Sequence, residues 1–409
     1  MSKVAPLDDG ASRPTLIRVG TIEYRRAAFG LFLGGFATFA LLYNTQPLFP
    51  MFTEYFGLGA ASASLALSVT TGTVGIGLVF ASSLSEVVGR KGIMTVSIIL
   101  AACFDLLAAF SPTFGLLLLF RALEGIALSG LPAVGMAYLA EEVEPTHLGA
   151  AMGIYIGGNA IGGLGGRLIT SILADYASWR VALGSLGALS LVIGIAFWNV
   201  LPESRHFTAR SFDPPALMRS LLHHFADPGL RLLFATGFLL MGSFVSVYNY
   251  LGFRLTTPPY NLSQTAVGVV FIVYSLGILS SAWAGKVADR LGRRRVLWVF
   301  MMVMLLGLLL TALSSLAFIF LGVALLTAGF FAAHSIASSW VGRRARVDRA
   351  QASSLYLLAY YMGSSIVGTS TGLAWSSHGW AGVTTVTGGL LLLAVAVGLR
   401  LRKLEPLPL

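Results

Sequence analysis

The chain has 409 residues, of which 56% are apolar and 11% are charged, and its formal net charge is +10. Soluble proteins carry about 25% charged residues, so this composition excludes a soluble globular protein. The 47 glycines and 15 prolines follow no triplet period, which excludes collagen-like and proline-rich linker chains and leaves lipid as the expected surroundings of the apolar surplus. The single cysteine, Cys103, excludes a disulfide bond within the chain.

Twelve apolar segments follow the basic N-terminal residues. A membrane-spanning helix needs about 20 apolar residues, and the chain length allows about 34 residues for each of twelve spans with its loop. We therefore expect an all-α polytopic membrane protein with twelve transmembrane helices. The predicted spans are 27–49, 61–84, 93–112, 114–140, 148–171, 180–201, 230–252, 265–288, 296–316, 317–341, 352–374 and 380–400.

Basic residues indicate the orientation of these spans. Of the 27 Lys and Arg residues, 23 lie before span 1, after spans 2, 8, 10 and 12, or between spans 6 and 7. All these positions fall on one side of the membrane, and Lys and Arg accumulate in cytoplasmic loops, so both termini are expected in the cytoplasm. This distribution also accounts for the positive net charge, and no nucleic-acid partner is expected.

The longest polar stretch between two spans divides the spans into two bundles of six. The first residues show no short apolar core with a cleavage site, so no removable signal peptide is expected. The predicted parts are a cytoplasmic N-terminal segment, 1–26, an N-terminal six-helix bundle, 27–201, a cytoplasmic linker, 202–229, a C-terminal six-helix bundle, 230–400, and a cytoplasmic tail, 401–409.

Similar strings recur at a near-constant distance in the two bundles. The strings LYNTQP and VYNYLG place Tyr43 and Tyr248 205 residues apart, and the loops after spans 2 and 8 place Glu86 and Asp289 203 residues apart. A steady offset across two unlike segments indicates an internal duplication. The two bundles are therefore expected to be pseudo-symmetric.

The loops after spans 2 and 8 combine glycine, a carboxylate and arginine at fixed spacing. Glycine permits a tight turn, and a carboxylate at the end of one helix can pair with the guanidinium that follows it. We expect a gating latch that breaks and re-forms as the helix ends separate; alternatively, the basic residues only set the topology. The latch residues are Glu86, Gly89 and Arg90 in the first loop and Gly285, Asp289, Gly292 and Arg293 in the second.

The second loop has the pattern G-x-x-x-D-R-x-G-R-R, which resembles the signature loop of the major facilitator superfamily. The resemblance extends over about residues 25 to 400, although in the first loop Ser82 replaces the first glycine and Glu86 replaces the aspartate. It implies a membrane transporter in which a cavity between two six-helix bundles opens alternately to either side.

Span 4 carries two charges one helical turn apart, Arg121 and Glu124. A charge at the centre of a bilayer costs roughly 2.5 to 3.5 kcal/mol, so these residues need a partner or a function. Asp105 in span 3 is expected at the depth of Arg121. The string FRALEGIALSG resembles the R-x-x-Q-G pattern of proton-linked members, which implies that Arg121 holds a carboxylate, Glu124 first and Asp105 second, whose proton affinity changes during transport. The alternative is a static ion pair.

In span 5 glycine recurs every fourth residue, at Gly158, Gly162 and Gly166, which leaves a bare helix face for a close neighbour. The stripe resembles the fifth-helix antiporter motif of the superfamily and implies a gating role, although Gly163 replaces its proline and Arg167 its last glycine. Packing alone is the alternative. For Arg167, the sequence leaves open whether the side chain extends to the membrane surface or lies at the mouth of a cavity.

In the resembled fold, spans 1, 4, 7 and 10 line the cavity. Their candidate substrate-binding residues combine aromatic rings, amides and one imidazole. Such a wall suits an amphipathic or aromatic solute better than a multiply charged one, and ordinary helix packing is the alternative for each residue. The candidates are Tyr43, Gln46, Phe244, Tyr248, Asn249 and His334.

Several longer strings, among them ALLYNTQPLFP, YIGGNAIGGLGGRLI and FFAAHSIASSW, are similar to the YnfM branch of bacterial inner-membrane drug and metabolite exporters. The resemblance implies a multi-pass protein of the bacterial inner (plasma) membrane that exports a small organic solute in exchange for protons. The alternatives are uptake or proton symport of a sugar or carboxylate, and a non-transporting membrane sensor with the same fold.

Patterns typical of enzymes are missing from the sequence. It offers no nucleophile, metal or phosphate-binding constellation, so we expect no enzyme activity, no cofactor and no metal. The expected partners are a small-molecule substrate, protons and the lipid bilayer. The chain is expected to act as a monomer.

Overall fold

The computed structural model describes residues 16–207 and 214–404. Three basic residues used for the predicted orientation, Lys3, Arg13 and Arg210, lie outside the described residues, as do parts of the predicted N-terminal segment, linker and tail. Within the described part, helices account for almost the whole chain.

The helices before the linker form the N-terminal half. α1 begins after Thr21, whose side chain accepts a hydrogen bond from the backbone amide of Tyr24 and so caps the helix. α3 ends and α4 begins at Gly89, whose φ of 103° favours glycine. The elements are α1 (Ile22–Tyr43), η1 (Gln46–Leu48), α2 (Phe49–Phe56), α3 (Ala60–Val88), α4 (Arg90–Ala109), α5 (Phe114–Leu128), α6 (Pro132–Glu142), α7 (Leu148–Tyr176) and α8 (Trp179–Val200).

The C-terminal half follows the linker helix α9 (Pro214–Ala226). Gly292 has a φ of 89° and separates α12 from α13 in the same way as Gly89 separates α3 from α4. Both related loops therefore make the tight turn that their glycines predict. The elements are α10 (Pro228–Thr256), α11 (Gln264–Val270), η2 (Phe271–Val273), α12 (Tyr274–Leu291), α13 (Arg293–Thr311), α14 (Leu316–Arg344) and α15 (Arg349–Lys403).

Nine helical segments of the described chain are long and apolar enough to cross a membrane. The twelve predicted spans need three more crossings, which come from α5 with α6, from α7, and from the second span inside α15. Predicted span 4 is not one continuous helix, since residues 129–131 divide it into α5 and α6. α7 is a further crossing, in which glycines occupy positions that larger apolar residues hold in the other spans. The last helix, α15, contains two spans, which meet at Gly379 with non-helical angles of φ 55° and ψ −138°.

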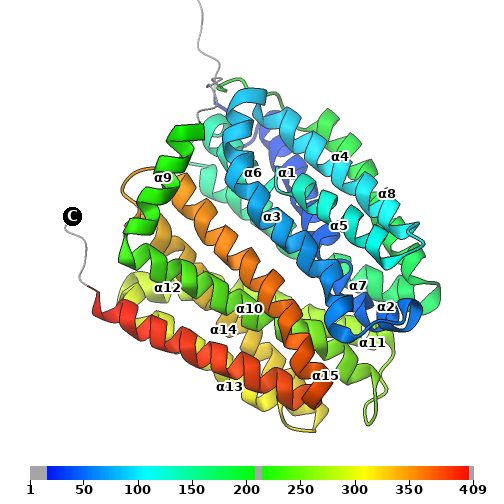
Figure 1. Ribbon diagram of the computed structural model, residues 1–409. Coiled ribbons are helices and arrows are strands. Elements are labelled where there is room, and N and C mark those ends of the chain that lie inside the picture. The colour runs from blue at the N-terminus through cyan, green and yellow to red at the C-terminus, as the bar shows by residue number, and fades with distance from the viewer. Residues whose placement is uncertain (1–15, 208–213, 405–409) are drawn as a thin grey trace, which may run out of the picture.

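The helices pack as two bundles. Figure 1 shows α1 and α3 to α8 on one side of the molecule and α10 and α12 to α15 on the other, with α3 and α15 in contact between them. Within the halves, α1 packs against α7 and α8, and α10 packs against α14 and α15. The linker helix α9 lies at the end of the molecule opposite α2 and α11 (Figure 1).

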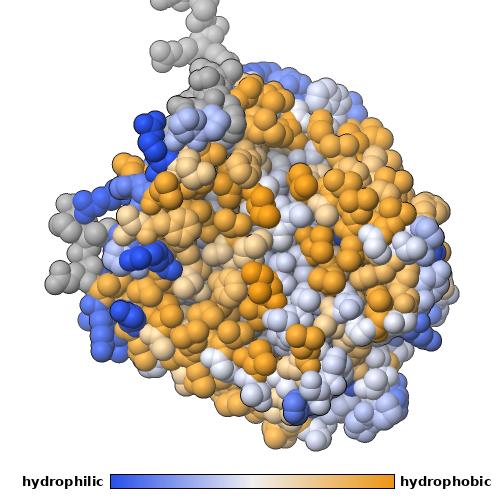
Figure 2. All heavy atoms as spheres, in the orientation of Figure 1, coloured by the Kyte–Doolittle hydropathy of each residue, from blue (hydrophilic) through white to orange (hydrophobic). Residues whose placement is uncertain are grey.

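The outer surface is apolar on both bundles. Figure 2 shows apolar side chains over both halves and a paler band between them. Large apolar residues are exposed on the outer helices, for example Val192 and Trp198 on α8 and Leu306 and Leu309 on α13. An apolar surface of this extent needs lipid around it, which agrees with a polytopic membrane protein.

The glycine stripe of α7 lies against α1. A Cβ atom added to Gly166 would lie 2.6 Å from the Cα atom of Ala40, and Gly158 and Gly162 face the backbone of α1 in the same way. In the C-terminal half, a Cβ on Gly372 of α15 would lie 2.5 Å from the Cα of Ala61 in α3. These glycines allow the close helix contacts that the four-residue spacing predicts.

Candidate functional site

Arg121 lies at the centre of a charge cluster buried inside the N-terminal half. Its Nη1 atom donates to Oε2 of Glu124 at 2.6 Å and to Oδ1 of Asp105 at 3.3 Å. Asn44 completes the cluster, because its side chain donates to Asp105 at 2.9 Å and accepts from Arg121 at 3.2 Å. The side chains of Arg121, Glu124 and Asp105 have no exposed surface.

The other donors of Arg121 bind backbone carbonyls. Nη2 donates to Leu41 O and Leu42 O at the end of α1, at 3.3 and 3.2 Å, and Nε donates to Ala66 O of α3 at 3.1 Å. The last carbonyls of a helix have no partner inside the helix and carry its negative dipole end, so a guanidinium is a favourable partner. Arg121 on α5 therefore joins α1, α3 and α4 at one point.

The cluster contains one positive group and two carboxyl groups. Within the described residues, Glu124 Oε1 and Asp105 Oδ2 are buried and have no hydrogen-bond partner. A buried acceptor without a donor is unfavourable, and so is a buried negative charge without a counter-charge. A proton bound by either carboxyl group would neutralise the excess charge, so the arrangement is chemically suited to take up and release one proton.

A cavity of about 410 Å³ lies between the two halves. Its walls come from α1 and α7 on one side and from α10, α12, α14 and α15 on the other. Among the described residues, α5 contributes nothing to its lining, which corrects the expectation that span 4 lines the cavity. The reason is that α1, α3 and α4 enclose the charged face of α5. The aromatic lining residues are Phe39, Tyr43, Phe244, Tyr274, Phe330, Phe331, His334, Tyr360 and Tyr361.

The C-terminal wall of the cavity is a stack of flat rings. Phe244 and Phe330 are parallel, with 3.8 Å between ring centroids and an interplanar angle of 8°. His334 continues the stack 5.8 Å from Phe330, and its Nδ1 atom is 3.0 Å from the hydroxyl oxygen of Tyr356. Such a wall favours contact with a planar apolar group.

The N-terminal wall carries Arg167, whose side chain is 1% exposed. Its Nε atom donates to Oε1 of Gln46 at 2.7 Å, and its Nη1 atom donates to Gly163 O at 2.6 Å. The guanidinium therefore lies between the two halves and does not extend to the membrane surface. Three rings surround it, with centroids at 4.0 Å for Tyr43, 4.6 Å for Tyr274 and 5.2 Å for Phe271.

The six candidate substrate-binding residues fall into two groups. Tyr43, Phe244 and His334 line the cavity. The others pack beside it: Gln46 donates from Nε2 to Oδ1 of Asn249 at 2.7 Å, which links the two halves. The hydroxyl oxygen of Tyr248 is 2.7 Å from Oγ1 of Thr327.

Hydrogen bonds between the halves occur near α2 and α11. The backbone amide of Thr265 donates to Asp175 at 3.0 Å, and Gln264 donates to the carbonyl of Pro47. The cavity instead extends toward the end that carries α9. Lining residues Ile156, Ser338 and Leu357 lie in the parts of α7, α14 and α15 that are nearer to that end.

The two related loops form different ion pairs. In the second loop, Arg293 donates to Asp289 at 2.9 Å, as the spacing predicts. In the first loop, the expected pairing of Arg90 with Glu86 is wrong: Arg90 lies at 2.7 Å from Glu141 at the end of α6. Glu141 of α6 and Ser85 of α3 both bind the guanidinium.

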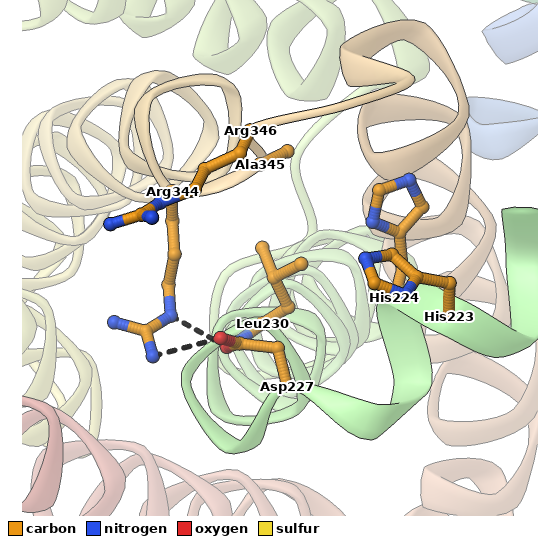
Figure 3. Close-up of a pocket in the computed structure, with 7 residues that line it drawn as sticks. All are labelled: His223, His224, Asp227, Leu230, Arg344, Ala345 and Arg346. Carbon is orange, nitrogen blue, oxygen red and sulfur yellow. Dashed lines mark hydrogen bonds and ion pairs between the residues drawn. The ribbon is translucent and has the colours of Figure 1, made fainter. Parts of the chain in front are cut away.

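A second pocket, of about 300 Å³, lies beside the linker helix. Figure 3 shows Asp227 and Arg344 facing each other there, with His223 and His224 of α9 on the other side of Leu230. Arg344 donates to both carboxylate oxygens of Asp227, at 2.6 and 3.0 Å. Burial raises the pKa of Asp227, but the hydrogen bonds from Arg344 and from the backbone of Leu230 outweigh it and hold the pKa below its ordinary value.

Sequence reasoning missed the aromatic cavity residues other than Tyr43, Phe244 and His334. It also missed four residues of the hydrogen-bonded charge clusters: Asn44, Glu141, Asp227 and Arg344. Asn44 had a signal, since the repeat places it opposite Asn249, 205 residues later. The other three are ordinary charged residues at helix ends, and only the packing of distant helices brings them to their partners.

Comparison with known proteins gives one family. Residues 31–258 and 255–408 match the model described as Major Facilitator Superfamily. The MFS-type transporter YybF of Bacillus subtilis (strain 168) is 47% identical, over 93% of this chain and 94% of its own. The inner membrane transport protein YnfM of Escherichia coli (strain K12) is 47% identical, over 95% of this chain and 93% of its own.

More distant matches include one further relative and two solved structures that share the fold. A probable 4-methylmuconolactone transporter of Cupriavidus pinatubonensis is 29% identical, over 61% of this chain and 59% of its own. Among solved structures, an inward-facing, unoccupied bacterial homolog of the human lysosomal transporter Spinster has a TM-score of 0.78, with 14% identity over 94% of this chain and 98% of its own. The nucleoside transporter NupG has a TM-score of 0.72, with 16% identity over 93% of this chain and 100% of its own.

Proposed function

The chain belongs to the major facilitator superfamily of membrane transporters, and from this we propose that it exports a small organic solute across the bacterial inner membrane in exchange for protons. The observation that carries the proposal is the fully buried cluster of Arg121, Glu124 and Asp105. The name of the muconolactone transporter relative supports a small organic solute.

Glu124 is the main proton-binding group in this proposal, and Asp105 is the second. Both carboxyl groups compete for one guanidinium, and each has an oxygen without a hydrogen-bond partner among the described residues. When both are ionised, the cluster holds one negative charge in surroundings where a charge is unfavourable. A proton on Glu124 neutralises the cluster, and losing that proton requires contact with water on one side of the membrane.

Residues 41–46 connect the proton site to the cavity. Arg121 binds the carbonyls of Leu41 and Leu42 and the side chain of Asn44. Between these contacts, Tyr43 lines the cavity and packs on Arg167. A change in the charge of the cluster alters the hydrogen bonds between Arg121 and residues 41–44. The same segment contacts the solute through Tyr43. Proton binding and solute binding are thereby coupled through one short piece of backbone.

The gating residues are assigned by position. With both termini in the cytoplasm, the bonds near α2 and α11 close the outer side, and the cavity opens inward. Opening the outer side requires the halves to rock, so the α9 end must close. Glu86, Gly89, Arg90, Gly285, Asp289, Gly292 and Arg293 lie at this end, while Gly158, Gly162, Gly166 and Arg167 keep α7 close to α1 and the cavity.

The latch proposal can be tested at Asp289. Asp289→Asn removes the ion pair with Arg293 and is expected to shift the ratio of inward-open to outward-open molecules. The readout is the labelling rate of single cysteines placed at each mouth of the cavity in a chain that lacks Cys103. Equal labelling rates with and without the substitution contradict a role in gating.

Proton exchange supplies enough free energy for export. One charge that crosses 100 mV gains about 2.3 kcal/mol, which sustains a concentration ratio of more than tenfold. Phosphate-binding motifs for ATP are not needed for such a cycle.

The proposal is tested in everted membrane vesicles with an acidified interior. Solutes from four classes are added: aromatic acids, aromatic amines, neutral amides and sugars. A transported solute is expected to release protons from vesicles that contain the protein. Glu124→Gln is expected to abolish the proton release. The matched control Glu54→Gln, at an exposed position of α2, is expected to leave it unchanged. Proton release that is equal with Glu124→Gln, or no release with any class, contradicts the proposal.

A further inference from the structure

Arg167 is a buried cation without an acidic partner. Within residues 16–207 and 214–404, its hydrogen bonds go to an amide oxygen and a backbone carbonyl, and no Asp or Glu forms an ion pair with it. Arg121 in the same half binds two carboxyl groups. An uncompensated charge at this depth is unfavourable, so a counter-charge has to come from a molecule outside the described chain.

The guanidinium has capacity for such a molecule. Its Nε and Nη1 atoms are engaged by Gln46 and Gly163, whereas Nη2 donates to no acceptor within the described residues. Arg167 also lines the cavity of about 410 Å³. A guanidinium offers five N–H donors, so a donor that faces a cavity can bind an anion there.

The C-terminal wall of the cavity, opposite Arg167, indicates the chemistry of the rest of the bound anion. Phe244 and Phe330 stack on each other and line the cavity together with Phe331 and Tyr360, so this wall is apolar and aromatic. Planar apolar groups pack favourably against such rings, edge-to-face as well as stacked. Small-molecule sites commonly enclose about 300 to 1,000 Å³, and this cavity falls at the small end of that range.

We propose that the solute is an organic monoanion, with one carboxylate bound by Arg167 and a flat apolar body packed against the aromatic wall that includes Phe244 and Phe330. The inference rests on the proposed function and narrows its substrate class. A single guanidinium matches a single negative charge, so a dianion such as an aryl phosphate is a poorer ligand. Exchange of this anion for an inward proton moves two elementary charges in the same electrical direction, so export also responds to the membrane potential.

Arg167 also has a structural role. Through Gln46 it is linked to Asn249 in the other half, so its replacement can change how the halves meet. The test therefore begins with the unmodified protein. Three probes of nearly equal shape separate charge from shape: 2-naphthoate, the neutral 2-naphthamide and the cationic 2-naphthylmethylamine. The dianion 2-naphthyl phosphate is the fourth probe.

Binding of each probe is measured by calorimetry with the purified full-length protein in nanodiscs. A charge-assisted hydrogen bond is expected to make 2-naphthoate bind at least about tenfold more tightly than 2-naphthamide. Arg167→Gln is expected to reduce this preference to less than about twofold, and Arg167→Lys to restore part of it. The matched control Arg231→Gln, at an exposed position, leaves the preference unchanged. Thermal unfolding and gel filtration identify variants that fail to fold.

Three results overturn the inference: equal affinity for 2-naphthoate and 2-naphthamide, no 2-naphthoate binding at millimolar concentration, or a preference that persists in folded Arg167→Gln. Vesicle assays separate this inference from the proposed function. Proton release by the amine or the amide alone supports export and contradicts the anion site. Binding of 2-naphthoate that depends on Arg167, without proton release by any solute, supports the site and contradicts proton-coupled export.

Discussion

Arg121 and Arg167 are both fully buried in the N-terminal half, yet their surroundings differ in almost every respect. Arg121 binds two carboxyl groups and three backbone carbonyls, and it lies outside the cavity lining. Arg167 binds no carboxyl group of the described chain and lines the cavity. The two charges therefore differ in what can neutralise them. Arg121 has carboxyl groups of the chain itself beside it, whereas we propose that Arg167 binds an external anion.

The two halves of the molecule sharpen this contrast. α5 and α14 begin at Phe114 and Leu316, and the same offset carries Arg121 and Glu124 to Val323 and Leu326. The charge cluster therefore has no counterpart at these positions of the C-terminal half, although the helices themselves correspond.

The largest effect is expected for Arg121→Ala. Without the guanidinium, both carboxyl groups remain protonated because neither has a counter-charge, so the cluster no longer releases a proton. Solute-driven proton release should fall to the background of empty vesicles. The protein should still reach the membrane, since neutral carboxyl groups are tolerated there, and immunoblots of membrane fractions check this. Proton release at the unmodified level in Arg121→Ala would contradict the assignment of Arg121 to the proton site.

The next largest difference separates the two carboxyl groups. Glu124→Gln should abolish the pH dependence of transport with little change in thermal stability. Asp105→Asn should mainly lower stability, by about 1 to 3 kcal/mol, because Asp105 accepts bonds from Asn44 and Arg121 that anchor α4. Transport at two pH values and thermal unfolding of each variant measure both effects. Reversed results would transfer the proton-binding role to Asp105.

A smaller effect is expected for Gly166→Ala. The added methyl group meets the backbone of Ala40, so α7 must move away from α1, at a cost of about 1 to 3 kcal/mol in stability. Because Arg167 follows Gly166, binding of 2-naphthoate should weaken, while the proton site on α5 is less affected. Gly157→Ala is the matched control on the same helix, since its Cβ would meet no neighbour. Equal behaviour of the two variants would contradict close packing at Gly166.

The smallest effect concerns the ion pair outside the spans. Asp227 has a pKa below its ordinary value, so its bond to Arg344 stabilises the folded protein fully at pH values above about 3.9. This contribution to stability is lost as the pH falls through the lowered pKa of Asp227. Asp227→Asn should lower the free energy of unfolding by less than about 1 kcal/mol near neutral pH. This difference should disappear in acid. Thermal unfolding across this pH range measures it, and a difference that grows in acid would contradict the assignment.

The sequence predicts the architecture well because membrane helices need long apolar segments and positively charged loops. It also predicts the tight turns at Gly89 and Gly292, since their φ angles favour glycine. It does not predict that Arg90 binds Glu141, because Glu141 is distant in the sequence and only the packing of α6 against α3 and α4 brings it to Arg90. The position of Arg167 is likewise undetermined, since only the packing of α7 against α1 and α12 decides whether the side chain points to the cavity or to lipid.

The central claim is that Glu124 changes its protonation when the solute binds. Infrared difference spectroscopy of the protein in nanodiscs, recorded on addition of a solute that drives proton release, detects protonated carboxyl groups directly. The account predicts a change in the carboxylic acid band that is absent in Glu124→Gln and present in Glu54→Gln. A transported solute that leaves this band unchanged in the unmodified protein would contradict the account.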